Sequence, residues 1–345
     1  MITPDAWFAE IAALQACHSP SGWEGEIDTY LQQRFQSLGH SPEQDEAGNL
    51  IVRIAGDRPE VIAITAHKDE IGMIVEAIAS DGRVRVNRLG GSYPWIYGEG
   101  PVELLGDRAI VPGILSFGSR HISHASPQKA LQTEKALTWP DTWIETKQSL
   151  EALQAAGVRP GTRVVVSRDR KRPQRLGQHI AGYALDNKAS LAILLDLAVH
   201  LKQPRYTVHL VASAKEEVGA VGALFHSQRQ RLAALIALEI IPVAPEYPIA
   251  ASEAPVLLSQ DAYGLYDEDL NQDLRQAAIA IDLPIQEAVV QGFGSDGSIA
   301  MKFGHVPRAA CLGFATDNTH GYEIANLAAI AQCSRWLQQY LQPVG

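Results

Sequence analysis

Continuous apolar runs that alternate with helical patterns after Gly182 constrain the fold of this chain more than any other feature. The apolar runs span 206–213, 235–241 and 306–312. The helical patterns span 187–201, 221–230, 270–281 and 326–341. A strand that lacks alternating polar residues is buried on both faces, as in a parallel sheet between layers of helices. The chain is therefore predicted to be an α/β protein with a mostly parallel central sheet and helices on both faces.

The first part of the chain shows the same two kinds of pattern. Helical patterns at 4–16 and 27–38 precede strand-like runs at 50–54 and 61–66. The string Ser21-Gly-Trp-Glu24 stands just before the second helical pattern and has the form of a capping box. We expect these elements to belong to the α/β domain.

The signals between these two parts are mostly β. Alternating runs at 73–78 and 83–87 flank Ser80-Asp81-Gly82, which is typical of a hairpin. Further strand-like runs span 109–111, 113–117 and 163–167, and a helix is expected at 146–156. We therefore expect one discontinuous α/β domain, 1–70 and 178–345, interrupted by an inserted small β domain at 71–177.

The composition excludes several classes of protein. Acidic side chains outnumber basic ones by 39 to 29, a formal charge of −10, which argues against nucleic acid as a partner. The three cysteines, Cys17, Cys311 and Cys333, are too few and too scattered for a disulfide framework. No apolar run reaches the roughly 20 residues of a membrane span, and no segment has the form of a signal peptide. We expect a cytoplasmic protein without a membrane or nucleic-acid partner.

Acids and histidines follow the predicted strands where those strands end. They are His67 and Asp69 after 61–66, Glu216 and Glu217 after 206–213, Glu239 after 235–238, Asp317 and His320 after 306–312, and Asp186 at a helix start. Ligands of open α/β sheets bind just beyond the carboxyl ends of the strands. The pattern therefore predicts a polar site at one rim of the sheet.

Burying this many carboxylates is costly unless cations compensate them. Two divalent ions that share a bridging carboxylate are a sufficient explanation for His67, Asp186, Glu217, Glu239 and His320. Imidazole and carboxylate ligands without thiolate suit Zn, Co or Mn. Glu216 remains free to act as a general base on water, and Asp69 is placed to hold the imidazole of His67. The spacing alone predicts a metal hydrolase.

The same residues also have simpler interpretations. Asp186 can be the N-cap of its helix, and Glu216 with Glu217 can be a solvated pair in a polar loop. This alternative requires five coincidences at one rim, so we prefer the metal site.

Six strings, in chain order, carry a resemblance to a known family. They are Ser19-Pro-Ser-Gly-Trp-Glu24, Asp45-Glu-Ala-Gly-Asn49, His67-Lys-Asp-Glu-Ile-Gly72, Leu185-Asp-Asn-Lys188, Lys215-Glu-Glu-Val-Gly219 and Gly292-Phe-Gly-Ser-Asp-Gly297. Together they resemble the tetrahedral (TET) aminopeptidases, which include glutamyl and deblocking aminopeptidases and members formerly labelled cellulases or endoglucanases. The resemblance covers nearly the whole chain, and ordered matches are far more specific than any one string.

The resemblance implies a zinc-exopeptidase-like catalytic domain that holds two divalent ions per subunit, Zn or Co first and Mn as an alternative. By position, His67, Asp186 and Glu239 bind one ion. Asp186 as the bridge, Glu217 and His320 bind the other.

The resemblance also implies roles outside the ligand set. Glu216 is the general base and Asp69 the orienting acid. The inserted domain, 71–177, serves dimerisation, and dimers assemble into a dodecamer. The implied activity is the removal of N-terminal residues from peptides.

Three positions depart from the pattern of the family. The ligand at Glu239 is more often aspartate, and Gly297 replaces a usual alanine. The last histidine usually stands in Arg-Tyr-Ile-His-Ser, whereas here the string is Asp317-Asn-Thr-His-Gly-Tyr-Glu323. The retained His-x-x-Glu supports the assignment of His320, and the changed flank leaves the substrate preference open.

Three other functions remain to be separated from an aminopeptidase. A di-metal deacylase or amidohydrolase needs the same metals and base, and differs only in how the amine is recognised. A non-catalytic binding shell would be expected to have lost at least one ligand. A glycanase needs a pair of carboxylates as acid and nucleophile, and the histidines have no part in that chemistry.

Overall fold

The computed structural model describes residues 3–126, 129–133 and 135–343. The chain divides into two compact units, each described by itself. The sheet unit comprises Met1–Glu70 and Arg172–Gly345, and the barrel unit comprises Ile71–Lys171. The chain returns to the sheet unit at Arg172, six residues before the expected boundary at 178. The reason is that Gln174–Leu176 pairs with a strand of the sheet unit. No helix among the described residues is both long and apolar enough to cross a membrane.

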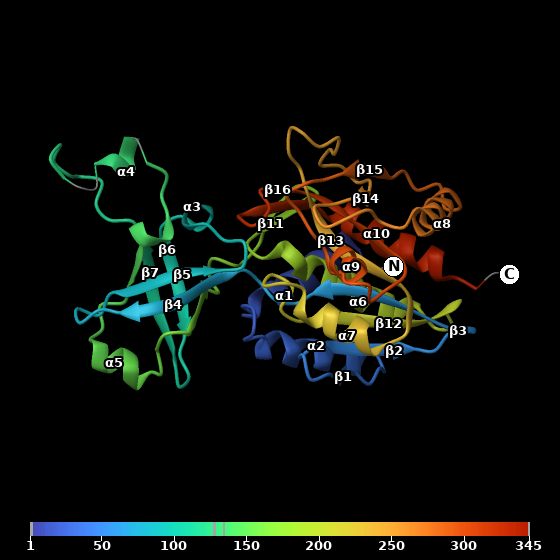
Figure 1. Cartoon of the computed structure of the whole chain (residues 1–345), viewed down its shortest axis with the longest axis horizontal. Coiled ribbons are helices and arrows are strands. Elements are labelled where there is room, and N and C mark those ends of the chain that lie inside the picture. The colour runs from blue at the N-terminus through green and yellow to red at the C-terminus, as the bar shows by residue number, and fades with distance from the viewer. Residues whose placement is uncertain (1–2, 127–128, 134, 344–345) are drawn as a thin grey trace. The chain divides into compact units, whose positions relative to one another are not determined.

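One mixed sheet forms the centre of the sheet unit (Figure 1). Its strands are β1 (Glu43–Gln44), β2 (Leu50–Ile54), β3 (Arg58–His67), β10 (Gln174–Leu176), β11 (His179–Gly182), β12 (Tyr206–Ser213), β13 (Leu232–Pro242), β14 (Val256–Gln260), β15 (Gln286–Val289), β16 (Ala309–Asp317) and β17 (Glu323–Asn326). The main path runs β1-β2-β12-β3-β13-β16-β17-β11-β10, and β14 and β15 join at β16. The central strands β12, β3, β13 and β16 are parallel, and the pairs at both ends of the path are antiparallel.

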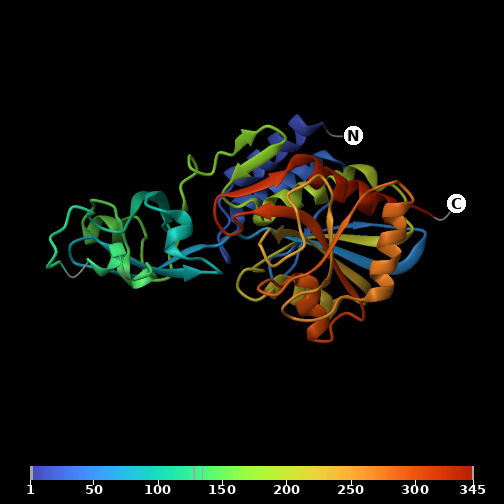
Figure 2. The ribbon, with the colours of Figure 1, turned by 90° about the horizontal axis from the view of Figure 1, so that it is seen from above.

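Helices cover both faces of this sheet, which confirms the predicted fold class. One face packs against α1 (Pro4–Ala16), α2 (Gly25–Ser37), α6 (Leu185–His200), α8 (Glu268–Ile279) and α10 (Leu327–Leu341). The other face packs against α7 (Val221–Arg229) and α9 (Asp296–Lys302). Figure 2 shows α1 and α10 together on one side of the sheet and α9 on the other. Neighbouring residues of β3 and β13 alternate between the two cores, so these strands are apolar on both faces.

The barrel unit is a closed sheet in the order β4-β5-β8-β7-β6-β9. The strands are β4 (Gly72–Ile78), β5 (Val84–Leu89), β6 (Gly100–Leu105), β7 (Ile110–Ser116), β8 (Trp143–Glu145) and β9 (Arg163–Val166). Short helices lie between them: α3 (Pro94–Tyr97), α4 (Ala130–Thr133) and α5 (Leu150–Ala155). Alternate apolar residues such as Val84, Val86, Val102 and Leu104 are buried, as expected for a small barrel filled by side chains.

One strand extends beyond its predicted end and has a glycine in its middle. The run predicted at 306–312 forms β16 as Ala309–Asp317. Gly313 pairs with Glu239 on β13, and a Cβ at Gly313 would lie 1.8 Å from the backbone oxygen of Glu239. Glycine is therefore required here by the close approach of two strands. Asp317 is consequently the last residue of β16 and does not lie in the following loop.

Two other local predictions were wrong. The helix expected at 146–156 is confined to Leu150–Ala155. The capping box at Ser21-Gly-Trp-Glu24 is not formed, and no side chain caps α2. The Ser21 hydroxyl donates to Asp69 instead, at 2.6 Å. Because α2 begins at Gly25 with Glu24 as its N-cap residue, Ser21 stands three residues too early to cap it, and its hydroxyl can donate to a buried carboxylate.

A pair of buried histidines joins β12 to α7 away from the polar rim. Nδ1 of His209 lies 3.3 Å from Nε2 of His226, and the two residues are 4% and 2% exposed. The pKa of each is lowered to about 4, chiefly by burial, with His226 and Arg53 contributing at His209 and Arg53 contributing at His226. The opposing acids are Glu43 near His209 and Asp45 near His226.

This pair predicts a loss of stability in mild acid. In the unfolded chain both histidines have pKa values near 6.5, so the unfolded state binds more protons as the pH falls from about 6.5 towards 4. The free energy of unfolding should therefore fall over this range. We expect the wild type to lose about 1–3 kcal/mol more than a His209→Asn, His226→Gln double variant between pH 7.5 and 4.5. Urea unfolding at each pH measures the difference, and equal slopes in the two proteins would contradict it.

Candidate metal centre

The carboxyl ends of two adjacent parallel strands bring a histidine and two glutamates together. His67 is the last residue of β3, and β12 ends beside it with Ser213 paired to His67. Glu216 and Glu217 lie in the loop that follows β12. Because the two strands are parallel and in register, this loop emerges at the same edge of the sheet as His67.

A third parallel strand supplies Glu239. β13 lies on the other side of β3, and the Glu239 carboxylate is 3.9 Å from Nε2 of His67. The side-chain amide of Asn187 donates to Glu239 at 3.0 Å and to the backbone oxygen of Leu238 at 2.7 Å. Asn187 thus orients the side chain of Glu239.

Asp186 lies between two histidines. Its Oδ1 is 2.9 Å from Nε2 of His67, and its Oδ2 is 3.4 Å from Nε2 of His320. Glu217 lies 3.8 Å from the same nitrogen of His320. The described residues therefore form two donor groups that share Asp186, and the ligand atoms within each group lie within 4.8 Å of one another. The groups are His67, Asp186, Glu239 and Asp186, Glu217, His320.

The donor chemistry of both groups fits divalent metal ions. Each group combines one imidazole with two carboxylates and no thiolate, a set that suits Zn, Co or Mn. Burial raises the pKa of Glu217 to about 7, with Asp186 adding to the rise and His320 opposing it. Burial lowers the pKa of His320, but the carboxylates of Asp186 and Glu217 outweigh it and raise that pKa to about 11. The groups therefore hold an excess of carboxylates that cations would compensate.

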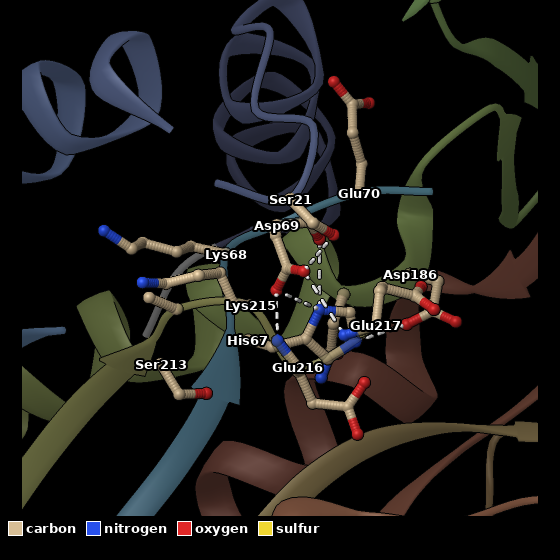
Figure 3. Close-up of polar contacts among 12 residues, drawn as sticks. Ser21, His67, Lys68, Asp69, Glu70, Asp186, Ser213, Lys215, Glu216 and Glu217 are labelled. Carbon is tan, nitrogen blue, oxygen red and sulfur yellow. Dashed lines mark hydrogen bonds and ion pairs between the residues drawn. The ribbon is translucent and has the colours of Figure 1, made fainter. Parts of the chain in front are cut away.

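Nearby lysines do not supply that compensation. Lys68 is fully buried and forms ion pairs with Asp28 and with Glu24. Lys188 is also fully buried and lies 3.3 Å from Glu70. In Figure 3 the side chains of Lys68 and Lys215 extend away from Asp186 and Glu217.

Asp69 organises the loop that carries Glu216 and Glu217. Its carboxylate accepts the backbone amides of Glu216 at 2.9 Å and Glu217 at 3.2 Å, and the Ser21 hydroxyl at 2.6 Å (Figure 3). Nδ1 of His67 lies 3.1 Å from the backbone oxygen of Asp69 and 3.6 Å from its carboxylate. A fully buried acid thus positions both the histidine and the two glutamates.

Glu216 belongs to neither donor group and faces the same buried region. Burial raises the pKa of its carboxyl well above the usual range, Asp296 and Glu217 add to the rise, and His67 opposes it. Asp296 begins α9, is 1% exposed and accepts the Ser213 hydroxyl at 2.6 Å. A carboxylate that stands next to two donor groups without belonging to either is placed to accept a proton from water and to return it.

The backbone at His320 adopts a costly conformation. Its φ is +64°, in the left-handed region that non-glycine residues occupy at a cost of about 1–3 kcal/mol. The carboxylate of Glu323 accepts the backbone amide of His320 at 3.0 Å and that of Asp186 at 3.0 Å. Burial and the nearby Asp186 raise the pKa of Glu323 to about 8, while its two amide hydrogen bonds and His320 oppose the rise.

The sequence patterns did not indicate the contacts of several polar residues around these groups. They are Ser21, Asn187, Asp296 and Glu323. All four lie in the motif strings quoted above or in the segment around His320, so the strings marked the residues without indicating what they contact. Apart from the amide of His320, which lies three residues from Glu323, their partners are 48 to 137 residues away in sequence, which no local spacing reveals.

Comparison with known proteins adds an independent line of evidence. The family model described as M42 glutamyl aminopeptidase matches residues 48–336. The glutamyl aminopeptidase of Lactococcus lactis is 27% identical over 239 residues, which cover 63% of this chain and 61% of that protein.

Solved structures share the fold over nearly the whole chain. A TET1 structure described as a dodecamer superposes with a TM-score of 0.86 at 21% identity, covering 98% of this chain and 99% of that chain. The Pyrococcus horikoshii TET1 peptidase, described as assembling into a tetrahedron or a large octahedral shell, gives 0.87 at 21% identity, covering 98% and 100%. At this level of sequence identity, the similarity shows a shared fold and nothing more specific.

Proposed function

The chain belongs to the M42 glutamyl aminopeptidase family, and we propose that it removes N-terminal residues from peptides with Glu216 as general base and two divalent ions as cofactors. Membership makes the protein a metal-dependent aminopeptidase, a hydrolase of peptide bonds. The residues proposed to hold the ions are His67, Asp186, Glu217, Glu239 and His320. Zn or Co is the first choice and Mn the alternative.

One observation carries this proposal: Asp186 directs one oxygen to each of the two histidines. A carboxylate shared in this way belongs to both donor groups, as a bridge between two ions requires. An N-cap aspartate would instead direct its oxygen to amides of its own helix, whereas the N-cap residue of α6 is Ala184 and both oxygens of Asp186 face histidines.

Several residues of the chain have separate roles in the proposed hydrolysis. When bound, a pair of divalent ions polarises the scissile carbonyl and makes the attacking water more acidic. Glu216 takes the proton from that water and returns it to the leaving amine. Asp69 keeps Glu216 and Glu217 in place through their backbone amides. Asn187 holds Glu239, so the ligand set is oriented before substrate arrives.

Replacing the proposed base tests this assignment. Glu216→Gln keeps the size of the side chain and removes its ability to accept a proton. We expect turnover to fall by roughly 10²–10⁴-fold while the metal content stays at two ions per chain. Steady-state kinetics on a peptide and elemental analysis of the same preparation measure the two effects.

Glu217→Gln is the matched control for that variant. It changes the adjacent glutamate, which belongs to a donor group, and is expected to lose metal together with activity. Full activity of Glu216→Gln at full metal occupancy would show that another group is the base.

Recognition of a free amine separates an aminopeptidase from a deacylase. We expect metal-loaded protein to release the first residue of a free-amine peptide at least tenfold faster than the same peptide with an acetylated N-terminus, and a chelator to abolish the reaction. Mass spectrometry of the products measures both rates. Preferential loss of the acetyl group would instead support the deacylase.

We also propose that the protein is a homo-oligomer in which the inserted domain, 71–177, serves dimerisation and dimers assemble into a dodecamer. The assemblies described for the two TET1 structures support this. Light scattering should give a mass near twelve times the chain mass of 37.4 kDa. A monomeric mass at micromolar concentration would contradict the proposal.

A cytoplasmic location is proposed on the state of the cysteines. The three cysteines are too few and too scattered for a disulfide framework, and Cys311 and Cys333 are buried free thiols, which suits a reducing compartment. Fractionation of cells into cytoplasmic and envelope proteins checks it.

A further inference from the structure

Glu323 is a buried carboxylate beside the second donor group without being a member of either group. It is 1% exposed and is the first residue of β17. Both of its oxygens are used: Oε1 accepts the backbone amide of His320 at 3.0 Å, and Oε2 accepts the backbone amide of Asp186 at 3.0 Å. One side chain thus contacts the backbone of two proposed ligands that are far apart in sequence.

The sheet places Glu323 where it can reach both segments. β17 pairs with β11, with Glu323 opposite Gly182, the last residue of β11. The chain continues from Gly182 into the turn that leads to Asp186. On its other side β17 pairs with β16, with Ile324 opposite Asp317, and the connection between these strands carries His320. Glu323 therefore stands between the two connections that deliver Asp186 and His320.

Neither connection has a regular conformation of its own. His320 has a φ of +64°, and Ala184, just before α6, has a φ of +59°. Asp186 itself is non-helical, with a ψ of 110°. The first amides of a helix have no partner within that helix, and an ionised carboxylate is a strong acceptor for such groups. The two hydrogen bonds of Glu323 therefore hold both ligands in conformations that local structure does not favour.

A purely structural role for Glu323 explains this arrangement less well than a role in positioning the two residues does. A buried acid that only stabilised the fold would gain the same hydrogen bonds from any two amides. Here both amides belong to residues of one donor group, whose side chains lie 3.4 Å apart. Asp69 likewise accepts the backbone amides of Glu216 and Glu217, but these two residues are adjacent in one loop, whereas Glu323 joins two different connections.

We propose that Glu323 is a positioning residue for the metal group formed by Asp186, Glu217 and His320, and that it sets the affinity of that group for its ion. The proposal rests on the proposed function, since it assumes that both donor groups hold metal. Glu323 binds no ion itself. It holds the backbones of two ligands at the separation that one ion requires.

Titration of the metal-free protein with Co²⁺ tests the proposal, because the visible absorption of Co²⁺ reports on its ligands. The Glu323→Gln variant presents one amide oxygen and one amide NH₂ group to the two backbone donors, so one hydrogen bond is lost. We expect wild type to bind two equivalents, and Glu323→Gln to bind the second equivalent at least tenfold more weakly. Glu323→Asp keeps the charge on a shorter side chain and should be intermediate.

Asp196→Asn is the matched control. Asp196 is a buried acid on the same helix, α6, and its carboxylate accepts the side chains of Ser334 and Gln338 on α10, remote from the donor groups. This variant is expected to lower the unfolding temperature while it binds both equivalents like wild type. The comparison separates the loss of a buried carboxylate from the loss of ligand positioning.

The outcomes are distinct. The proposal would be overturned if Glu323→Gln bound two equivalents of Co²⁺ with the affinity and the absorption spectrum of the wild type. If Glu323→Gln cannot be obtained folded, the same criterion applies to Glu323→Asp. Failure of the wild type to bind a second equivalent would overturn the two-metal function itself, which is a different result from any change confined to the variants.

Discussion

The repulsion among carboxylates buried at one rim of the sheet is the constraint on which the rest of this structure depends. Three parallel strands end, or pass, beside one another there, and the segments around them carry Asp69, Asp186, Glu216, Glu217 and Glu239. Buried charges of one sign cost several kcal/mol each unless they are paired or hydrogen-bonded. The nearby lysines, Lys68 and Lys188, are directed to other acids. Divalent cations bound at the two donor groups would compensate these carboxylates.

The buried acids at this rim are used in two ways, which differ in what their side-chain oxygens contact. Some point side-chain oxygens towards the histidines, as Asp186 does towards both His67 and His320. Others, Asp69 and Glu323, direct their oxygens to backbone amides of the segments that carry the ligands. The second use lowers the cost of burial and at the same time gives the loops a defined conformation. An open rim of a sheet thereby becomes a rigid donor set without regular secondary structure.

Prediction from the sequence succeeded where one physical pattern dominated. The apolar runs that form β3, β12 and β13 must be buried on both faces, and the helices between them follow from their spacing. It failed where a distant contact changed a local preference. The strand predicted at 306–312 stops before Gly313, yet Gly313 lies inside β16, where the backbone of Glu239 approaches too closely for a side chain. Ser21 looked like a helix cap, yet its hydroxyl is taken by Asp69.

By itself the sequence determined the α/β class, the presence of an inserted β unit, and the residue types at the ends of the strands, because burial and periodicity are properties of short segments. Only the tertiary structure decided which oxygen of Asp186 faces which histidine, and that Glu323 and Asp69 hold the ligand backbones. Those contacts depend on the register between strands and on connections that meet from positions up to 148 residues apart. No local pattern contains that information, because a carboxylate has the same local preferences whether it faces a histidine, an amide or water.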